Sequence, residues 1–237
     1  MRGVFSYLFL MVLVFVLFSC GKPKPKKNPV PPASTLYSKA EKDYQKGYLD
    51  QAYLEYKKLR DFYPASSLAV KALLKMADIK YLQGYYVQAL TLYQEFTKFY
   101  PANPAVPYAI FQIGNCYYKL KLSYDRDPTY TKKAILTYKR LLEEFPGNPY
   151  ESLVKKRIKK LTEILAKHEL YVAKFYYKMG YYKAAYKRLC FLILNYPHTK
   201  YAKAGKKLLK EYYKKALIAT KDLQTGKKKD FWGAPVP

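Results

Sequence analysis

Residues 40–64 read AEKDYQKGYLDQAYLEYKKLRDFYP, and the spacing within this stretch decides the fold. Its opening alanine and Tyr44 are four residues apart, so they lie on one face of a helix. Gly47 tolerates the left-handed conformation that ends a helix, and Pro64 cannot continue one. Ala52 and the tyrosine four residues after it repeat the first spacing. The stretch therefore predicts a helix, a turn, a second helix and a break.

The same spacing recurs twice more along the chain. Residues 77–101 and 173–197 preserve the intervals between the small residue, the glycine, the second alanine and the proline, although Leu189 replaces the last tyrosine. One such pair of helices cannot bury its apolar face alone, so the pairs must stack. The pattern resembles the tetratricopeptide repeat (TPR), which implies an all-α superhelical array of about five helix-turn-helix repeats. TPR domains bind many different proteins, so this resemblance indicates a fold and not a function.

Two irregularities interrupt this spacing. Residues 122–128 add a loop between the helices of the third repeat, where Asp127 and Pro128 are expected to be the N-cap and the first-turn proline of the next helix. In the fourth repeat the first helix is longer and carries an apolar stripe. The stripe consists of Val154, Ile158, Leu161, Leu165, His168, Val172, Phe175 and Met179. We interpret His168 as a packed residue, because no neighbours at ligand spacing accompany it.

The N-terminus has the features of a bacterial lipoprotein signal. Residues 4–18 form a nearly unbroken apolar run, shorter than the roughly 20 residues of a membrane span. Ser19 and Cys20 follow it and resemble a lipobox, with Phe18 as an unusual occupant of the flexible position. The resemblance implies that residues 1–19 are a cleaved signal peptide and that Cys20 carries a covalent lipid. A plain membrane anchor with an incidental cysteine is the alternative.

Composition marks the other segment boundaries. Residues 20–33 include the sequence KPKPKKNPVPP, which cannot form a helix and predicts an extended tether. Gly21 favours sorting to the outer membrane, by resemblance to proteobacterial lipoproteins. Residues 34–217 form the expected TPR domain, and residues 218–237 an expected disordered tail. The expected repeats cover about 34–64, 65–101, 102–146 and 147–197, with a capping segment at 198–217.

Lysine dominates the charge of the chain. There are 44 Lys and Arg against 17 Asp and Glu, a formal net charge of +27, and only six of the basic residues are Arg. Arginine is the residue that recognises phosphates and bases, so the composition argues against nucleic acid as a partner. The lysines either form a solvated surface without a partner, or they attract anionic lipid or an acidic protein.

Residue patterns for chemistry are lacking in the sequence. No nucleophile has a histidine at plausible spacing, no glycine-rich phosphate loop follows a strand, and no carboxylates are grouped. We therefore expect neither an enzyme nor a metal site, and no cofactor besides the lipid. Cys116 and Cys190 are expected to be buried free thiols, and a disulfide is the alternative.

Residues 34–217 also resemble the BamD-type (ComL-like) TPR lipoproteins of the outer-membrane β-barrel assembly machinery. The most specific matches are residues 125–127 (DRD), 165–169 (LAKHE), 172–177 (VAKFYY) and 185–197. The resemblance implies a lipid-anchored adaptor that faces the periplasm from the inner leaflet of the outer membrane. It implies binding to the periplasmic POTRA domains of a BamA-type barrel protein, to unfolded outer-membrane proteins and to other assembly lipoproteins. Arg188 matches a basic position that family members turn toward a POTRA domain, and an ordinary surface arginine is the alternative.

Carrying the peptide-facing positions of TPRs onto this chain predicts a groove for an extended substrate segment in the first three repeats. The predicted groove residues are Tyr37, Tyr44, Lys71, Leu74, Asp78, Tyr108, Phe111 and Asn115. Such a mixture of aromatic, aliphatic and hydrogen-bonding groups suits the terminal strand of a β-barrel, whose terminal carboxylate Lys71 would meet. Packing of Tyr44 and Phe111 between helices is the alternative.

Two other functions are compatible with the same features. Another TPR lipoprotein, serving cell-wall or pilus assembly, would share the fold and the anchor. A lipid-anchored binder of envelope polyanions is the second possibility, and the lysine excess motivates it.

Overall fold

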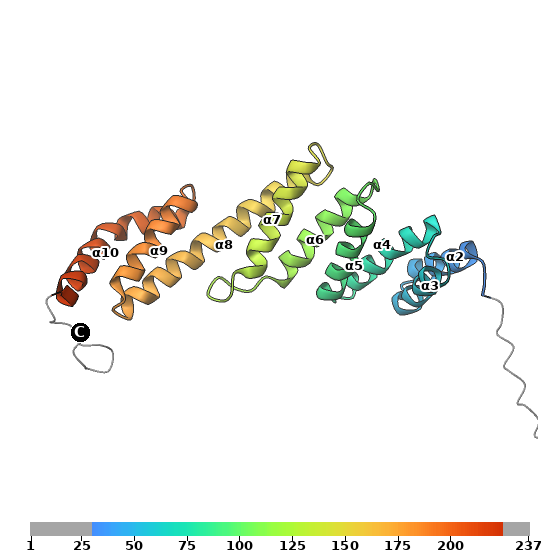
Figure 1. Cartoon of the computed structure of the whole chain (residues 1–237), viewed down its shortest axis with the longest axis horizontal. Helices are drawn as coiled ribbons and strands as arrows, with labels where there is room; N and C mark the ends of the chain where they lie inside the picture. Colours follow the sequence, from blue (N-terminus) through green and yellow to red (C-terminus); the bar gives the residue numbers. More distant parts are fainter. Residues whose placement is uncertain (1–29, 225–237) are drawn as a thin grey trace, which may run out of the picture. The chain divides into compact units, whose positions relative to one another are not determined.

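The computed structural model describes residues 30–224, and the regular elements in this range are nine α-helices. Figure 1 shows them following one another side by side in chain order. Their bounds are α2 (Ala33–Gln45), α3 (Leu49–Phe62), α4 (Ser67–Leu82), α5 (Tyr86–Phe99), α6 (Val106–Leu120), α7 (Thr129–Glu144), α8 (Glu151–Lys178), α9 (Tyr182–Asn195) and α10 (Lys200–Gln224).

The helices form four helix-turn-helix pairs and a single last helix, which is the arrangement of a TPR array. Three pairs are joined by a short turn with a glycine at φ +80°: Gly47, Gly84 and Gly180. Glycine adopts this left-handed conformation without strain. At the first turn the backbone N–H of Tyr48 donates to the carbonyl of Asp43 at 2.9 Å, which closes the end of α2. Helices α6 and α7 are joined instead by the longer loop that the sequence predicts.

The alanine–tyrosine pattern forms the contact between paired helices. Small alanines let the two backbones approach closely, and the ring of the following tyrosine fills the space beside them. The residues of this contact have no exposed surface: Ala40, Ala52 and Tyr56 in the first pair, Ala77, Ala89 and Tyr93 in the second, Ala134 and Tyr138 in the third, and Ala173, Ala185 and Leu189 in the fourth. The repeat seen in the sequence is therefore the repeat of the core.

A turn made of an aromatic residue and a proline separates each pair from the next helix. The polar side chain two residues after the proline accepts a hydrogen bond from a backbone N–H at the start of that helix, either in its first turn or at the residue just before it. The bonds are Leu68 to Ser66 at 3.2 Å, Ala105 to Asn103 at 2.9 Å, Tyr150 to Asn148 at 2.9 Å and Ala202 to Thr199 at 3.1 Å. Each satisfies one of the N–H groups that the start of a helix leaves unpaired.

Helix α8 has 28 residues and packs on different partners along its length. The predicted apolar stripe is correct at Val154 and Leu161, which are buried in one core with α7. It is wrong at its end, because Phe175 and Met179 are 50% and 48% exposed. There the buried residues are Ala166, Leu170 and Ala173, which form a second core with α9 and α10. The change of partner rotates the buried face.

Helix α10 is longer than the sequence predicts. It ends at Gln224, so the prediction that residues 218–237 form a disordered tail is wrong for residues 218–224, which are helical. No proline or glycine between Gly205 and Gly226 ends the helix earlier. Residues 225–237 lie outside the described residues, as do the predicted signal, Cys20 and most of the predicted tether within residues 1–29.

Candidate peptide-binding surface

In each of the first three repeats, the buried tyrosine of the second helix donates its hydroxyl to a polar side chain on the first helix. The acceptor directly follows the small residue of the first helix, at the edge of the core. The pairs are Tyr56 with Glu41, Tyr93 with Asp78 at 2.5 Å, and Tyr138 with Asn115 at 2.7 Å. Leaving such a buried hydroxyl without a partner would cost about 1–3 kcal/mol. The bonds therefore favour one register of the two helices.

A side chain from the first helix of the next repeat reaches the same acceptor. The contacts are Lys75 with Glu41 at 3.0 Å, Tyr108 with Asp78 at 2.6 Å, and Arg157 with Asn115. Each acceptor thus connects the two helices of its own repeat with the first helix of the next. We call these nine residues the polar ladder: Glu41, Tyr56, Lys75, Asp78, Tyr93, Tyr108, Asn115, Tyr138 and Arg157. The ladder ends at the third repeat, because Leu189 has no hydroxyl.

The two carboxylates of the ladder have opposite pKa shifts. Burial raises the pKa of Asp78, and the hydrogen bonds from Tyr108 and Tyr93 offset only part of this effect. Burial also raises the pKa of Glu41, but the hydrogen bonds from Tyr56 and Lys75 outweigh it, so the net pKa is lowered. Two features separate the carboxylates: Asp78 is the more deeply buried, and only Glu41 has a direct ion pair.

The predicted groove residues of the first two repeats lie along this ladder and are partly accessible. The ring of Tyr37 contacts that of Tyr56 edge-on, with centroids 5.7 Å apart, and the ammonium of Lys75 lies 4.8 Å from the ring centroid of Tyr44. Leu74 is half-buried against the core. Lys71 is exposed. In these repeats the structure keeps aromatic, aliphatic and charged groups on one surface.

In the third repeat, two of the predicted groove residues lie inside the domain. Phe111 stacks on Tyr150 with ring centroids 4.1 Å apart, and Asn115 is only 5% exposed. The start of α8 covers both of them, because Tyr150 and Arg157 pack over this end of α6. A peptide cannot reach these two residues without displacing α8 side chains. The accessible surface is therefore smaller than the sequence predicts, and Tyr108 is its only predicted member in this repeat.

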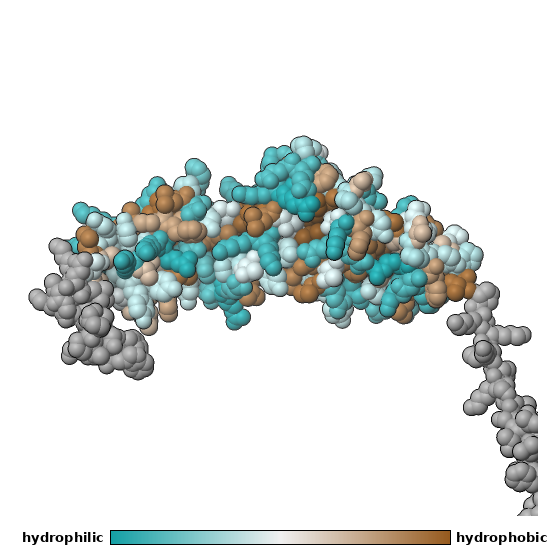
Figure 2. Space-filling view, viewed as in Figure 1, coloured by the Kyte–Doolittle hydropathy of each residue, from teal (hydrophilic) through white to brown (hydrophobic). Residues whose placement is uncertain are grey.

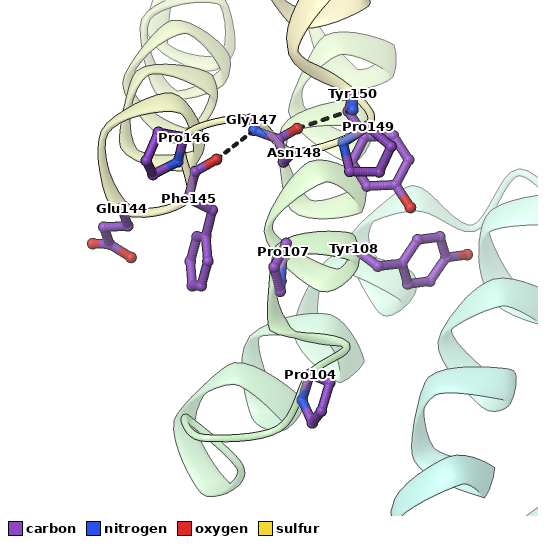
Figure 3. A pocket seen from close by; sticks show the side chains of 10 residues that line it. All are labelled: Pro104, Pro107, Tyr108, Glu144, Phe145, Pro146, Gly147, Asn148, Pro149 and Tyr150. Carbon is purple, nitrogen blue, oxygen red and sulfur yellow. Dashed lines mark hydrogen bonds between the residues drawn. The ribbon is translucent and has the colours of Figure 1, made fainter.

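Two equivalent hollows of about 500 Å³ each lie beside the starts of α4 and α6. Each is formed by the first turns of one helix and by the aromatic–proline turn that follows the same repeat. Lys71 lines one and Tyr108 the other, at matched positions 37 residues apart. Figure 3 shows the second hollow, where Asn148 donates to the carbonyl of Phe145 and accepts from the N–H of Tyr150. These turn residues were not among the predicted groove residues, although the regular repetition of the turn along the sequence was a signal that could have found them.

Arg188 on α9 is paired within the domain. Its guanidinium donates to the carboxylate of Glu169 on α8 at 3.0 Å. The Glu169 side chain is 4% exposed, whereas that of Arg188 is 43% exposed. The pair thus joins the two helices of the fourth repeat, where the polar ladder has ended. A guanidinium has five N–H donors arranged as a planar fork, so the exposed donors of Arg188 can still bind a carboxylate of another protein.

His168 holds the long loop of the third repeat against α8. Its Nδ1 lies 2.7 Å from the carbonyl oxygen of Tyr124, and the ammonium of Lys167 lies 3.5 Å from the centroid of the Tyr124 ring. The interpretation of His168 as a packed residue is consistent with these contacts. In the same loop the carboxylate of Asp127 accepts from the N–H of Thr129 at 3.2 Å, and α7 begins at Thr129, one residue later than predicted.

Both described cysteines are free thiols. Cys116 is buried and Cys190 is half-buried, and burial raises the pKa of Cys116 to about 12. The disulfide alternative is therefore wrong for this structure. Within residues 30–224, no three His, Cys, Asp or Glu side chains come together as a metal site requires. In the same range, no helix combines the length and apolarity needed to cross a membrane.

Comparisons with known proteins identify the family. The chain is 27% identical to the outer membrane protein assembly factor BamD of Pasteurella multocida, over 91% of this chain and 86% of that protein. It is 34% identical to the BamD protein of Neisseria gonorrhoeae over 38% of this chain and 34% of that one. Among solved structures, the TPR2AB domain of yeast Sti1 aligns with 81% of this chain and 74% of its own, at 18% identity and a TM-score of 0.48. Residues 30–228 match the YfiO family, described as an outer membrane lipoprotein. Because this match covers most of the 237 residues, the chain belongs to the YfiO family of outer membrane lipoproteins.

Proposed function

We propose that this chain is a lipid-anchored periplasmic adaptor in the assembly of β-barrel outer-membrane proteins, and that it acts by binding and not by catalysis. The observation that carries the proposal is the match to the Pasteurella multocida assembly factor, which extends over 91% of the chain. The chain would be held at the inner leaflet of the outer membrane through Cys20. It would bind a BamA-type barrel protein and unfolded substrates, alongside other assembly lipoproteins.

The first three repeats are the proposed site for an unfolded substrate. An extended segment needs apolar contacts at regular intervals and partners for its backbone groups. The two matched hollows provide proline and aromatic walls, and the hydroxyls of Tyr37 and Tyr108 lie on partly accessible side chains. Lys71 is exposed at the rim of one hollow and is the proposed partner of a terminal carboxylate. These features support a weak and sequence-tolerant binding surface.

The fourth repeat is the proposed site for the BamA-type partner. Arg188 is oriented by its bond to Glu169, and it remains 43% exposed. Pre-orienting the fork reduces the entropy that is lost when it binds a second carboxylate. This supports a contact with an acidic side chain of a POTRA domain.

A crosslinked pull-down from the native envelope tests the proposed function. The full chain, with its own signal and anchor, is the bait, and an unrelated lipoprotein of the same membrane is the control. Enrichment of a BamA-type barrel protein and of unfolded outer-membrane proteins is expected. Enrichment of pilus or cell-wall assembly proteins without the barrel protein would instead support the other class of TPR lipoprotein.

A further inference from the structure

The basic charge of the chain is concentrated in its last repeats. Residues 33–148 contain 17 Lys and Arg against 11 Asp and Glu, a formal charge of +6. Residues 149–220 are a shorter stretch with 18 basic residues against 4 acidic ones, a formal charge of +14. A uniform preference for lysine would not remove the acidic residues from one end. The excess therefore belongs to the surface of α8, α9 and α10.

Five lysines of α10 lie on one exposed face. Lys203, Lys206, Lys207, Lys210 and Lys214 are spaced by three or four residues, or are adjacent, so they share one side of the helix. No ion pair among the described side chains involves any of them. Glu211 is the only acidic residue among residues 200–220, and Tyr177 donates to it at 2.5 Å. Five ammonium groups are thus left without counter-charges from the domain.

Exposed apolar side chains continue this face toward the end of α10. Tyr213, Leu217 and Ile218 are 49%, 44% and 46% exposed. Helix α10 packs mainly on α9 and α8, and these three side chains remain exposed on the other side. We call the five lysines and these three residues the outer face of α10. Figure 2 shows hydrophilic and apolar residues side by side over the last helices.

A shallow hollow of about 390 Å³ lies beside the last described turns of α10. Tyr181, Lys183, Lys187 and Thr220 are among the residues that line it. Lys183 and Lys187 are exposed, and Tyr181 is 51% exposed. Ala219 and Thr220 line the hollow from the side of α10 that packs on α9, so the hollow is separate from the outer face.

We propose that the outer face of α10 binds the surface of a bilayer that contains anionic phospholipid. A row of lysines next to exposed tyrosine, leucine and isoleucine is the composition of a helix that lies in a membrane interface. The lysines bind the phosphate layer by charge, and the apolar residues enter the boundary of the acyl chains. An acidic protein site would favour arginine forks, whereas the outer face has only lysine.

This second attachment adds to the proposed lipid on Cys20. A lipid on Cys20 would hold only the N-terminal end of the chain, whereas the outer face of α10 would hold the last repeat against the bilayer. The inference does not depend on the adaptor function, because it concerns a different helix from the hollows and from Arg188. A failed vesicle experiment would therefore leave the pull-down result unaffected.

Vesicle binding tests the proposal. The protein is the chain from residue 20 with Cys20→Ala, so that no lipid is attached and every described residue is kept. The test variant replaces Lys203, Lys206, Lys207 and Lys210 by Gln. The control variant removes the same charge from the first two repeats by replacing Lys42, Lys46, Lys57 and Lys98, all exposed, by Gln. Circular dichroism verifies that both variants stay helical.

The parent protein should bind vesicles of equimolar phosphatidylglycerol and phosphatidylethanolamine, and not vesicles of phosphatidylcholine. Each lysine near the membrane surface contributes about fivefold in affinity, so the α10 variant should bind about 100-fold or more weakly. The control variant should change less than about threefold, because charges beyond a Debye length are screened. Equal losses in the two variants, or equal binding to both kinds of vesicle, would overturn the proposal.

A second variant tests the apolar part of the outer face. Leu217→Ser with Ile218→Ser keeps every charge, and both side chains are already partly exposed, so the helix should remain folded. Binding that persists in high salt should fall about tenfold, because the apolar contribution is not screened. If the parent protein binds soluble polyanions as well as it binds vesicles, and this variant changes nothing, the outer face is not a membrane surface.

Discussion

The ring of Tyr138 occupies the space that a side chain at position 114 would need. A Cβ atom built on Gly114 would lie 2.4 Å from Cε1 of Tyr138 and 2.6 Å from its Cδ1. The first two repeats have alanine at this position, at residues 40 and 77. The third repeat therefore brings its tyrosine closer to the first helix, where the hydroxyl reaches Asn115 at 2.7 Å.

We predict that Gly114→Ala destabilises the domain by about 1–3 kcal/mol, as overpacking does in a closed core. In an exposed helix the same change would stabilise by up to about 1 kcal/mol, so the sign of the effect tests the contact. Urea unfolding followed by circular dichroism measures it. Tyr138→Leu in the same chain should make the added methyl group much less costly. A stabilising effect of the single change would contradict the contact.

Asp78→Asn should raise stability at neutral pH. The folded state raises the pKa of Asp78, so the wild-type chain loses stability as the pH rises through that raised pKa. Asparagine still accepts from Tyr93 and Tyr108, as Asn115 accepts from Tyr138 in the next repeat. We expect a melting temperature about 2–4 °C higher at pH 7 for each kcal/mol gained, and no difference below about pH 4.

Glu41→Gln should have the opposite effect. The folded state lowers the pKa of Glu41, so its contribution is present at neutral pH and is lost as the pH falls through the lowered pKa. The melting temperature of the variant should be lower than that of the wild type at pH 7, and the difference should shrink in acid. If the melting temperatures of the two variants changed with pH in the same way, the two carboxylates would not differ in the direction of their pKa shifts.

Arg188→Glu should both weaken partner binding and lower the melting temperature. For an arginine without a partner in the domain, the sequence predicts weaker partner binding with an unchanged melting temperature. The structure corrects that expectation, because Glu169 is 4% exposed and would be left facing a second carboxylate. Since Arg188 is partly exposed, we expect the substitution to lower the free energy of unfolding by about 1–3 kcal/mol.

Arg188→Lys separates these two roles. Lysine keeps a positive charge near Glu169 but loses the fork, so the fold should be nearly unchanged while recovery of a BamA-type partner falls. Lys187→Gln, which changes an exposed neighbour, is the matched control. Full recovery of the partner by the lysine variant would show that the fork is not the contact.

Lys71→Ala should weaken binding of a peptide that ends like a β-barrel strand. The parent affinity is expected to be micromolar, about −8 kcal/mol, and loss of one exposed charge contact should reduce it about fivefold. Fluorescence anisotropy with the full chain measures this, and Lys57→Ala is the control. Tyr108→Phe is a better second substitution than Tyr108→Ala, because it keeps the ring and removes only the two hydrogen bonds of the hydroxyl, with Asp78 and with Gln112. Crosslinking of the peptide only beyond residue 150 would place the binding site elsewhere.

Cys20→Ala should leave the helical domain intact and release the protein from membranes or block its processing. Cys20 lies outside the helices of residues 30–224, so we expect their fold to be unchanged. Fractionation of the envelope, with detection of the N-terminus by mass spectrometry, measures the outcome. Signal removal with unchanged outer-membrane fractionation would rule out lipid on this residue as the anchor.

The sequence by itself determined the helical repeat and the residues of its core. Ala40, Gly47 and Pro64 act through local backbone geometry and helix contact, so their spacing can be read without knowing the neighbouring repeat. The long first helix of the fourth repeat and the loop at residues 122–128 were predictable for the same reason. The full length of α10 was not predicted, although residues 218–224 contain no helix breaker and are helical in the structure.

Only the tertiary structure decided which polar groups are accessible. Asn115 and Phe111 match groove positions in the repeat pattern, yet the start of α8 covers them, and α8 begins 36 residues after Asn115. In the sequence, Arg188 is one of many basic residues. In the structure its guanidinium lies 3.0 Å from the carboxylate of Glu169, which is 19 residues earlier in the chain. Such contacts join residues from different helices, and their distances depend on how whole helices pack. Local spacing therefore predicts the repeat, but the exposure of each side chain depends on the neighbour that covers it.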